Sequence, residues 1–305
     1  MRVLVTDKAD PRGLDRIRQA GHEVVEKLGV QGPELAEALV GFDALLVRGA
    51  TKVTGDVLRA TTSLKVVVRA GTGLDNVDAG AARHKGVAVF NTPNANSVSV
   101  AELVFGLLIA FERHVVDAAS ELRQGRWEKT RFSGHEIAGR RLGLVGFGRI
   151  GREVATRARG FGMEVWAHDP VIGEWPEDFG WVKRVELAEL LVACEVVSLH
   201  VPLTSDTRGL IGSEALSRMK LDAVLINCAR GGVVDEAALL ETLQARKIRG
   251  AILDVFAVEP APADHPLLKL PNVLATPHLG ASTAEAQRRA GEDAASVLIE
   301  ALAKL

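Results

Sequence analysis

The stretch Gly143-Leu-Val-Gly-Phe-Gly-Arg-Ile-Gly151 decides the fold of this chain. Gly146, Gly148 and Gly151 fit the pattern G-x-G-x-x-G. The first glycine allows a tight turn, the second lets backbone N–H groups approach a pyrophosphate, and the third lets a helix pack on a strand. Apolar residues before the glycines predict a strand, and the residues after them predict a helix whose N-terminus attracts phosphate. This context is typical of a dinucleotide-binding domain.

A carboxylate stands at the end of the next predicted strand. Asp169, in Glu164-Val-Trp-Ala-His-Asp169, lies close to the ~20 residues beyond the glycines at which an acid meets the ribose hydroxyls. A carboxylate accepts hydrogen bonds from both free hydroxyls and repels a 2′-phosphate. The following Pro170-Val171-Ile172 supply no cation to hold such a phosphate. The sequence therefore predicts NAD rather than NADP as the cofactor.

The composition is that of an ordinary globular protein. With 305 residues the chain can form two domains, and its net charge of −2 gives no electrostatic case for nucleic acid or an anionic membrane as a partner. Cys194 and Cys228 lack metal-binding spacing and indicate reduced thiols in a cytoplasmic protein. The segment Met1–Asp7 reaches an acid too early for a signal peptide, and no apolar run has the ~18–20 residues that span a bilayer.

Both halves of the chain alternate short apolar strands with helical segments, which is typical of parallel sheets covered by helices on both faces. Strands are expected at 2–6, 23–25, 44–47, 65–68 and 88–90, and again at 142–145, 164–167, 196–199, 223–227, 250–253 and 273–275. A last helical segment at 283–302 has no strand after it, so we expect it to return to the first domain.

The predicted fold class is therefore α/β, with two doubly wound parallel-sheet domains and a cleft between them. Residues 1–96 and 282–305 would form a discontinuous, flavodoxin-like substrate-binding domain. Residues 97–281 would form a Rossmann domain that binds NAD.

The segment Val98–Gln124 is expected to form one long helix with Ser97 as its N-cap. Its first half is apolar on nearly every side, which is typical of a helix buried all round. A central core helix and a subunit interface both account for this pattern. We favour the interface, because an all-apolar helix outside a large core needs a partner surface. A homodimer is therefore expected, in which a charge at Val104 or Leu108 disrupts the pairing.

Three polar side chains follow predicted strands of the second half: Arg230, Glu259 and His278. Because the carboxyl ends of parallel strands meet at one edge of a sheet, we expect them to converge. Arginine offers a planar fork of donors to a substrate carboxylate, and histidine exchanges protons near neutral pH. Singly, each residue has an ordinary structural explanation as an ion pair, a core histidine or a loop acid. Their joint placement favours catalysis on an anionic carbonyl or hydroxyl compound.

The chain resembles the D-2-hydroxyacid dehydrogenases over essentially its whole length, and most of all their phosphoglycerate branch. Besides the glycine fingerprint, the segments that carry the resemblance are Leu46–Thr54, Arg69–Asp78, Asn91–Ser97, Asn227–Glu236, Asp254–Pro260 and Pro277–Thr283. One departure is Val201 in His200-Val-Pro202, where close relatives commonly have threonine, so this chain lacks that hydroxyl as a cofactor contact.

The resemblance implies a role for each matching residue. Arg230 would bind the substrate carboxylate and carbonyl oxygen, His278 would exchange the proton, and Glu259 would pair with His278. Asp254 would hold the nicotinamide carboxamide. The NAD site would comprise Thr72, Gly146, Gly148, Arg149, Ile150, Gly151, Asp169, Cys228, Ala229, Arg230, Asp254, His278, Gly280 and Ala281. The substrate would also meet Arg48, Arg69, Gly71 and Asn96, and no metal is expected.

The activity that the resemblance implies is NAD-dependent oxidation of 3-phosphoglycerate to 3-phosphohydroxypyruvate, the first step of serine synthesis by the phosphorylated route. The same chemistry on glyoxylate, hydroxypyruvate or D-lactate is one alternative. An NAD-sensing binding protein similar to the C-terminal-binding-protein corepressors is another. Many family members continue into a C-terminal domain that binds serine, whereas this sequence ends at Leu305. A natural short form and a piece of a longer chain both account for that end.

Overall fold

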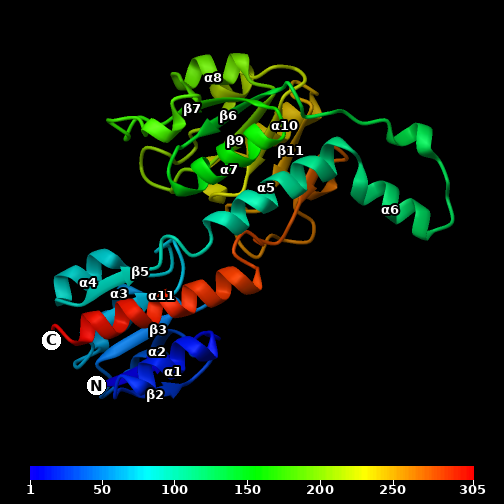
Figure 1. Ribbon diagram of the computed structural model, residues 1–305. Coiled ribbons are helices and arrows are strands. Elements are labelled where there is room, and N and C mark those ends of the chain that lie inside the picture. Colours follow the sequence, from blue (N-terminus) through cyan, green and yellow to red (C-terminus); the bar gives the residue numbers. More distant parts are fainter. The chain divides into compact units, whose positions relative to one another are not determined.

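The computed structural model describes all residues from 1 to 305 and divides into two compact units (Figure 1). One unit combines Met1–Asn96 with Ala281–Leu305 and is called the terminal unit here. The other, the central unit, consists of Ser97–Gly280. Both contain a purely parallel sheet with helices, so the predicted α/β fold class is confirmed. None of the helices combines the length and apolar character that crossing a membrane requires.

The terminal unit is built on a five-stranded sheet in the order β2-β1-β3-β4-β5. Its strands are β1 (Arg2–Val5), β2 (Glu23–Glu26), β3 (Ala44–Val47), β4 (Val66–Arg69) and β5 (Ala88–Asn91). Its helices are α1 (Pro11–Gln19), α2 (Gly32–Ala38), α3 (Gly55–Ala60), α4 (Ala79–Lys85) and α11 (Ala284–Leu302). Two separate apolar clusters pack within this unit, one of which includes residues of α1 and α11 and the other residues of α2 and α3.

The returning helix α11 packs directly on α1. A side-chain carbon at Gly13 would lie only 2.5 Å from the carbonyl oxygen of Gly291, so the two backbones approach as closely as glycine allows. Leu14, Ile17 and Leu298 join the same buried cluster. The last helix of the sequence therefore belongs to the same unit as the first strands.

The central unit is built on a seven-stranded sheet in the order β12-β11-β10-β9-β6-β7-β8. Its strands are β6 (Arg141–Val145), β7 (Glu164–His168), β8 (Lys183–Arg184), β9 (Val196–Leu199), β10 (Val224–Asn227), β11 (Gly250–Leu253) and β12 (Val273–Ala275). Its helices are α5 (Ser97–Glu112), α6 (Val115–Arg123), α7 (Arg149–Gly160), α8 (Leu187–Ala193), α9 (Ser213–Arg218) and α10 (Glu236–Gln244). Short 3₁₀ turns occupy Lys129–Phe132, Glu177–Phe179, Gly231–Val233 and Pro266–Lys269.

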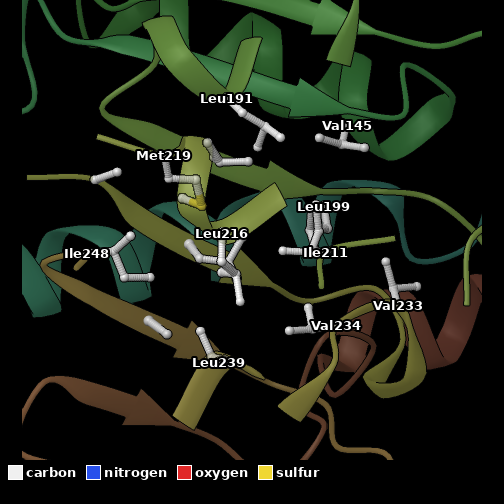
Figure 2. Close-up of a cluster of buried hydrophobic side chains, with 14 of the residues drawn as sticks. Val145, Leu191, Leu199, Ile211, Leu216, Met219, Val233, Val234, Leu239 and Ile248 are labelled. Carbon is white, nitrogen blue, oxygen red and sulfur yellow. The ribbon is translucent and has the colours of Figure 1, made fainter. Parts of the chain in front are cut away.

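Apolar clusters also hold the central sheet. Figure 2 shows one of them, in which Leu199 of β9, Leu216 of α9 and Leu239 of α10 are among the buried side chains. The strands β6 and β9 lie side by side. Strands β7 and β8 follow on the outer side of β6, and β10, β11 and β12 follow on the outer side of β9. This is the topological switch point at which open α/β sheets bind their ligands.

The predicted helix Val98–Gln124 is not continuous. It ends as α5 at Glu112 and resumes as α6 at Val115, because His114 adopts a left-handed backbone conformation with φ 53°. Val104 and Leu108 are completely buried in the core of the central unit itself. The expectation that these two side chains form a subunit interface is therefore wrong, and a charge at either position would disrupt the core of this unit.

The segment 113–133, called the arm here, extends away from the rest of the central unit (Figure 1). Its α6 contains no buried residue. Where the arm leaves the unit, the buried carboxylate of Glu112 pairs with the guanidinium groups of Arg140 and Arg249. The backbone N–H of His135 also donates to the Glu112 carbonyl oxygen. Both ends of the arm are therefore fixed at one point.

Candidate active site and cofactor site

The predicted site residues of the central unit follow strands that end at the same level. Asn227 at the end of β10 pairs in register with Leu199 of β9 and with Leu253 of β11, and Leu253 pairs with Ala275 of β12. On the other side, Val145 of β6 pairs with Leu199. The loops that begin at residues 146, 200, 228, 254 and 276 therefore leave the sheet along one edge.

The glycine turn after β6 is held tightly against its neighbour. Gly146 has φ 95°, and a side-chain carbon there would lie 2.7 Å from the carbonyl oxygen of His200. A side-chain carbon at Gly151 would overlap the carbonyl oxygen of Gly146, so helix α7 packs as closely as the third glycine permits. At Gly148, by contrast, such a carbon would meet nothing within 4 Å. The turn is thus closed on the protein side and open at Gly148.

Helix α7 begins without a side-chain cap. Gly148 is its N-cap, and its first turn contains no acidic residue. The exposed Arg149 and the half-buried Ile150 open the helix. Uncapped N–H groups at the positive end of a helix dipole, with open space at Gly148, are suited to the phosphates of a dinucleotide.

Asp169 is fixed by backbone donors. Its Oδ2 accepts a 2.8 Å hydrogen bond from the N–H of Phe147 in the glycine turn, and its Oδ1 accepts bonds from the N–H groups of Val171 and Ile172. The carboxylate is only partly buried. It therefore lies beside the turn that would hold the pyrophosphate, at the place where an acid receives ribose hydroxyls.

His278 and Glu259 form the pair that the sequence predicts. Nδ1 of His278 lies 2.7 Å from Oε2 of Glu259, and both side chains are partly exposed, at 49% and 37%. Oε1 of Glu259 accepts a bond from the N–H of Phe256, which orients the carboxylate. The pair leaves Nε2 of the imidazole to exchange a proton with a bound ligand.

The backbone of His278 is held in an unusual conformation by Asp254. His278 has φ 54°, a left-handed conformation that costs of order 1–3 kcal/mol for a residue other than glycine. The completely buried Asp254 accepts bonds from Thr276 Oγ1, Leu279 N–H and Gly280 N–H, and its carbonyl oxygen accepts from the His278 N–H. In this structure Asp254 therefore fixes the loop that presents the histidine.

The Arg230 loop is fixed in a similar way. Buried Asn227 donates from Nδ2 to the carbonyl oxygen of Arg230 and accepts at Oδ1 from the N–H of Ala229. Cys228 and Ala229 are buried, and burial raises the pKa of the Cys228 thiol. A side-chain carbon at Gly231 would overlap the backbone of Phe256, so the loops that carry Arg230 and Glu259 lie in contact. Arg230, Glu259 and His278 thus occupy adjoining loops.

One supporting residue was not predicted from the sequence. Glu236, in the first turn of α10, accepts a bond at Oε1 from the N–H of Ala257 and pairs at Oε2 with His265 Nε2 at 3.3 Å. It therefore braces the loop that carries Glu259. The only signal for this role in the sequence was the position of Glu236 at the start of a helix next to the Arg230 motif. Acidic residues are common at helix starts because they interact favourably with the helix dipole, so this position did not indicate a brace.

His200 lies behind the glycine turn. Its Nε2 bonds to Ser198 Oγ at 3.0 Å, and burial lowers the pKa of the imidazole to about 3. Val201 presents its methyl groups close to Gly146. The ring is therefore neutral at physiological pH and contributes to the wall of the turn without charge.

The predicted substrate residues of the terminal unit also lie at one edge of their own sheet. Val47, Arg69 and Asn91 pair in register at the ends of β3, β4 and β5. The Arg69 guanidinium lies against Gly71, which has φ 148°, and within 3.8 Å of the side-chain position at Gly49. Thr72 Oγ1 donates to Asn96 Oδ1 at 2.7 Å, and Arg48 Nη1 donates to the Lys8 carbonyl oxygen. Ala281, the remaining predicted cofactor residue, is half-buried at the start of the returning segment.

Residues 105–280 match the family described as "D-isomer specific 2-hydroxyacid dehydrogenase, NAD binding domain". The chain belongs to the D-2-hydroxyacid dehydrogenases. Its central unit is the NAD-binding domain of that family, and the prediction of NAD as the cofactor is confirmed.

Curated relatives with two different names are about equally similar. The human D-3-phosphoglycerate dehydrogenase is 45% identical over 98% of this chain, and that of Methanocaldococcus jannaschii is 46% identical over 95%. The chain spans only 56% and 55% of their lengths. A hydroxypyruvate reductase of Thermotoga maritima is 46% identical over 95% of this chain and 94% of its own.

Solved structures share the whole architecture. A protein from Thermus thermophilus has a TM-score of 0.90 and 39% identity, covering 100% of this chain and 97% of its own. A glyoxylate reductase from Paecilomyes thermophila has a TM-score of 0.91 and 30% identity, covering 100% and 96%. A formate dehydrogenase from Staphylococcus aureus, solved with NAD, has a TM-score of 0.85 and 29% identity, covering 98% and 94%.

Proposed function

We propose that this protein oxidises 3-phosphoglycerate to 3-phosphohydroxypyruvate with NAD, a reaction that begins serine synthesis. The observation that carries the choice of substrate is the pair of arginines, Arg48 and Arg69, that follow or end neighbouring strands of the terminal unit. Two guanidinium groups at one sheet edge favour a phosphate dianion over an uncharged substituent. The relatives named D-3-phosphoglycerate dehydrogenase agree with this choice.

The residues of the central unit account for the chemistry on the hydroxyl-bearing carbon. Bound NAD supplies the hydride acceptor. Arg230 would hold the substrate carboxylate, because its loop is fixed by Asn227 and a guanidinium binds a carboxylate through two parallel hydrogen bonds. His278 would accept the hydroxyl proton while Glu259, 2.7 Å from its other ring nitrogen, stabilises the imidazolium that forms.

The test compares kcat/KM for 3-phosphoglycerate, D-glycerate and D-lactate in the oxidative direction, and for hydroxypyruvate and glyoxylate in the reductive direction. We expect 3-phosphoglycerate to be preferred over D-glycerate by at least about tenfold, the worth of one good charged contact. Arg48→Ala and Arg69→Ala should remove that preference and leave turnover of D-glycerate unchanged. An equal or greater kcat/KM for D-glycerate in the wild-type enzyme contradicts the proposal.

A second candidate is a reductase of hydroxypyruvate or glyoxylate. The Thermotoga maritima relative named hydroxypyruvate reductase favours it, because at 46% identity it is as similar to this chain as the phosphoglycerate dehydrogenases are. It predicts rapid NADH-dependent reduction of the unphosphorylated keto acid and no effect of the Arg69 substitution. A corepressor-like protein without metabolic activity would turn over none of these acids and would bind a peptide partner.

We also propose that two copies associate through the arm, in the cytoplasm. Trp127 is 80% exposed, and Val115, Val116 and Leu122 are exposed on α6. Large apolar side chains gathered on an exposed segment are typical of a surface that binds another protein chain. Val116→Asp with Leu122→Asp should give folded monomers in analytical ultracentrifugation. A wild-type chain that sediments as a monomer at micromolar concentration contradicts this proposal.

A further inference from the structure

An aromatic cluster packs around one residue of the glycine turn. Phe147, the residue between the first two glycines of the fingerprint, has a completely buried ring. Trp175 stacks on that ring with the centroids 4.5 Å apart and the planes within 7°, and Phe179 meets it edge-on at 5.3 Å. Both partners come from the segment between β7 and β8, called the cap segment here (170–182).

The cap segment is anchored at both of its ends. At its start, Val171 and Ile172 donate their N–H groups to Asp169, whose other oxygen receives the N–H of Phe147. At its end, Arg184 donates to the carbonyl oxygens of Ile172 and Gly173. Its guanidinium also lies 5.4 Å from the centre of the Trp175 ring. Trp175 is therefore held in place over Phe147.

The turn itself has few other restraints on its open side. Gly148 caps α7 without any side-chain hydrogen bond, and its surroundings are open. The position of the N–H groups of the turn therefore depends on Phe147, which precedes Gly148. The Phe147 ring is fixed by Trp175, and its N–H is fixed by Asp169. Arg152 adds a bond to the Phe147 carbonyl oxygen. Donors that are fixed before binding hold a phosphate more tightly, because no ordering cost remains.

We propose that Trp175 is a positioning residue for NAD: by stacking on Phe147 it fixes the glycine turn, and thereby the N–H groups that receive the pyrophosphate. The role is indirect, because Trp175 would act through its contact with the Phe147 ring. It concerns cofactor affinity only and is independent of which hydroxy acid the enzyme uses.

The experiment measures the dissociation constants of NAD, ADP and adenosine by calorimetry for Trp175→Ala and Trp175→Phe. We expect Trp175→Ala to raise Kd for NAD and ADP about 3- to 10-fold, the usual worth of an aromatic pair. Adenosine, which has no pyrophosphate, should lose less than about twofold. Trp175→Phe keeps a stacking ring and should restore affinity, and kcat at saturating NAD should not change.

Trp181→Ala is the matched control. Trp181 lies at the end of the same segment. Its ring centroid is 6.0 Å from that of Phe179, but its ring does not stack on Phe147. We expect a similar loss of thermal stability with an unchanged Kd for NAD. If Trp175→Ala fails to fold, Trp175→Leu keeps the apolar volume without the ring and replaces it in every measurement.

Two results would overturn the proposal. One is an unchanged Kd for NAD in the folded Trp175→Ala or Trp175→Leu protein. The other is an equal loss of affinity for adenosine and ADP, which would place the effect at the ribose and Asp169 instead of at the turn. In support, Trp175→Ala should weaken NAD no further when Phe147→Leu is already present, because the two rings act together.

Discussion

Both units are parallel sheets with helices, but the start of α7 in the central unit lacks the side-chain cap that most helices of the terminal unit have. In the terminal unit, Asp10, Thr54, Asp78 and Thr283 accept hydrogen bonds from the first turns of α1, α3, α4 and α11. In the central unit, α7 begins at Gly148 without a side-chain cap. Side chains thus satisfy first-turn donors in four helices of the terminal unit, whereas α7 keeps its first-turn donors for the cofactor. The same sheet and helices therefore carry different functions according to a few residues at the strand ends.

The largest expected effect comes from the strand ends of the central unit. His278→Ala should lower kcat by about 10²–10⁴, the usual contribution of a positioned acid/base group, with little change in the Kd of NAD. Arg48→Ala in the terminal unit should instead raise KM for the acid and leave the Kd of NAD unchanged. Steady-state kinetics and calorimetry measure both. A His278→Ala enzyme as fast as the wild type would show that the proton goes elsewhere.

A substitution at the glycine turn should weaken cofactor binding in addition to its cost in stability. Gly146→Ala would place a carbon 2.7 Å from the His200 carbonyl oxygen at φ 95°, so we expect Kd for NAD to rise about 10- to 100-fold. Gly86 of the terminal unit also has a positive φ, of 75°, but open surroundings. Gly86→Ala should cost about 1 kcal/mol of stability and leave NAD binding intact. Equal NAD affinity in the two variants would remove the distinction.

Asp169 should determine the choice between NAD and NADP. Asp169→Ala removes an acceptor for the ribose hydroxyls and should weaken NAD about tenfold, whereas NADP loses less because its phosphate is no longer repelled. The measurement is the ratio of kcat/KM for the two cofactors. A ratio that stays at the wild-type value would place the acid away from the ribose.

His200 should make the central unit sensitive to acid. Burial lowers the pKa of its imidazole in the folded protein to about 3, below the ~6.5 of an unfolded chain, so the unfolded state binds the extra proton between these values. The stability contributed by the neutral ring is complete above pH ~6.5 and is lost as the pH falls toward 3. The expected slope is up to about 1.4 kcal/mol per pH unit. Denaturant titrations from pH 4 to 8 should show a flatter profile for His200→Gln.

The smallest effect is expected for a helix cap. Asp78 Oδ1 accepts a 2.8 Å bond from the N–H of Ala81 at the start of α4. Asp78→Ala should reduce the free energy of unfolding by about 1 kcal/mol and leave Kd for NAD unchanged. A higher Kd for NAD in this variant would mean that the helix caps of the terminal unit also affect the NAD site.

The fold could largely be predicted from the sequence because the inner strands of both sheets, such as β3, β10 and β11, are buried on both faces. The continuous apolar runs at 44–47 and 250–253 coincide with β3 and β11. Strand β8 was missed, because its two residues, Lys183 and Arg184, are exposed and carry no apolar pattern. The break at His114 was also missed, because helical periodicity alone does not report a left-handed residue.

The candidate site was predictable where residues follow strands directly. The pairing of Glu259 with His278 agrees with the prediction, since the ends of parallel strands converge. The braces behind that pair were not predictable. Glu236 and Trp175 act through contacts with residues distant in sequence, and neither spacing nor composition distinguishes them from an ordinary helix start or a loop aromatic.

The ion cluster at Glu112 has a consequence for how this enzyme could diversify. Because the arm leaves and rejoins the central unit beside one buried carboxylate, its length and sequence can change without moving any strand. We expect an exchange of residues 115–132 between related chains to alter which chains associate while each retains its cofactor affinity. The surface through which copies associate could then change in evolution without a change in the residues that bind the substrate.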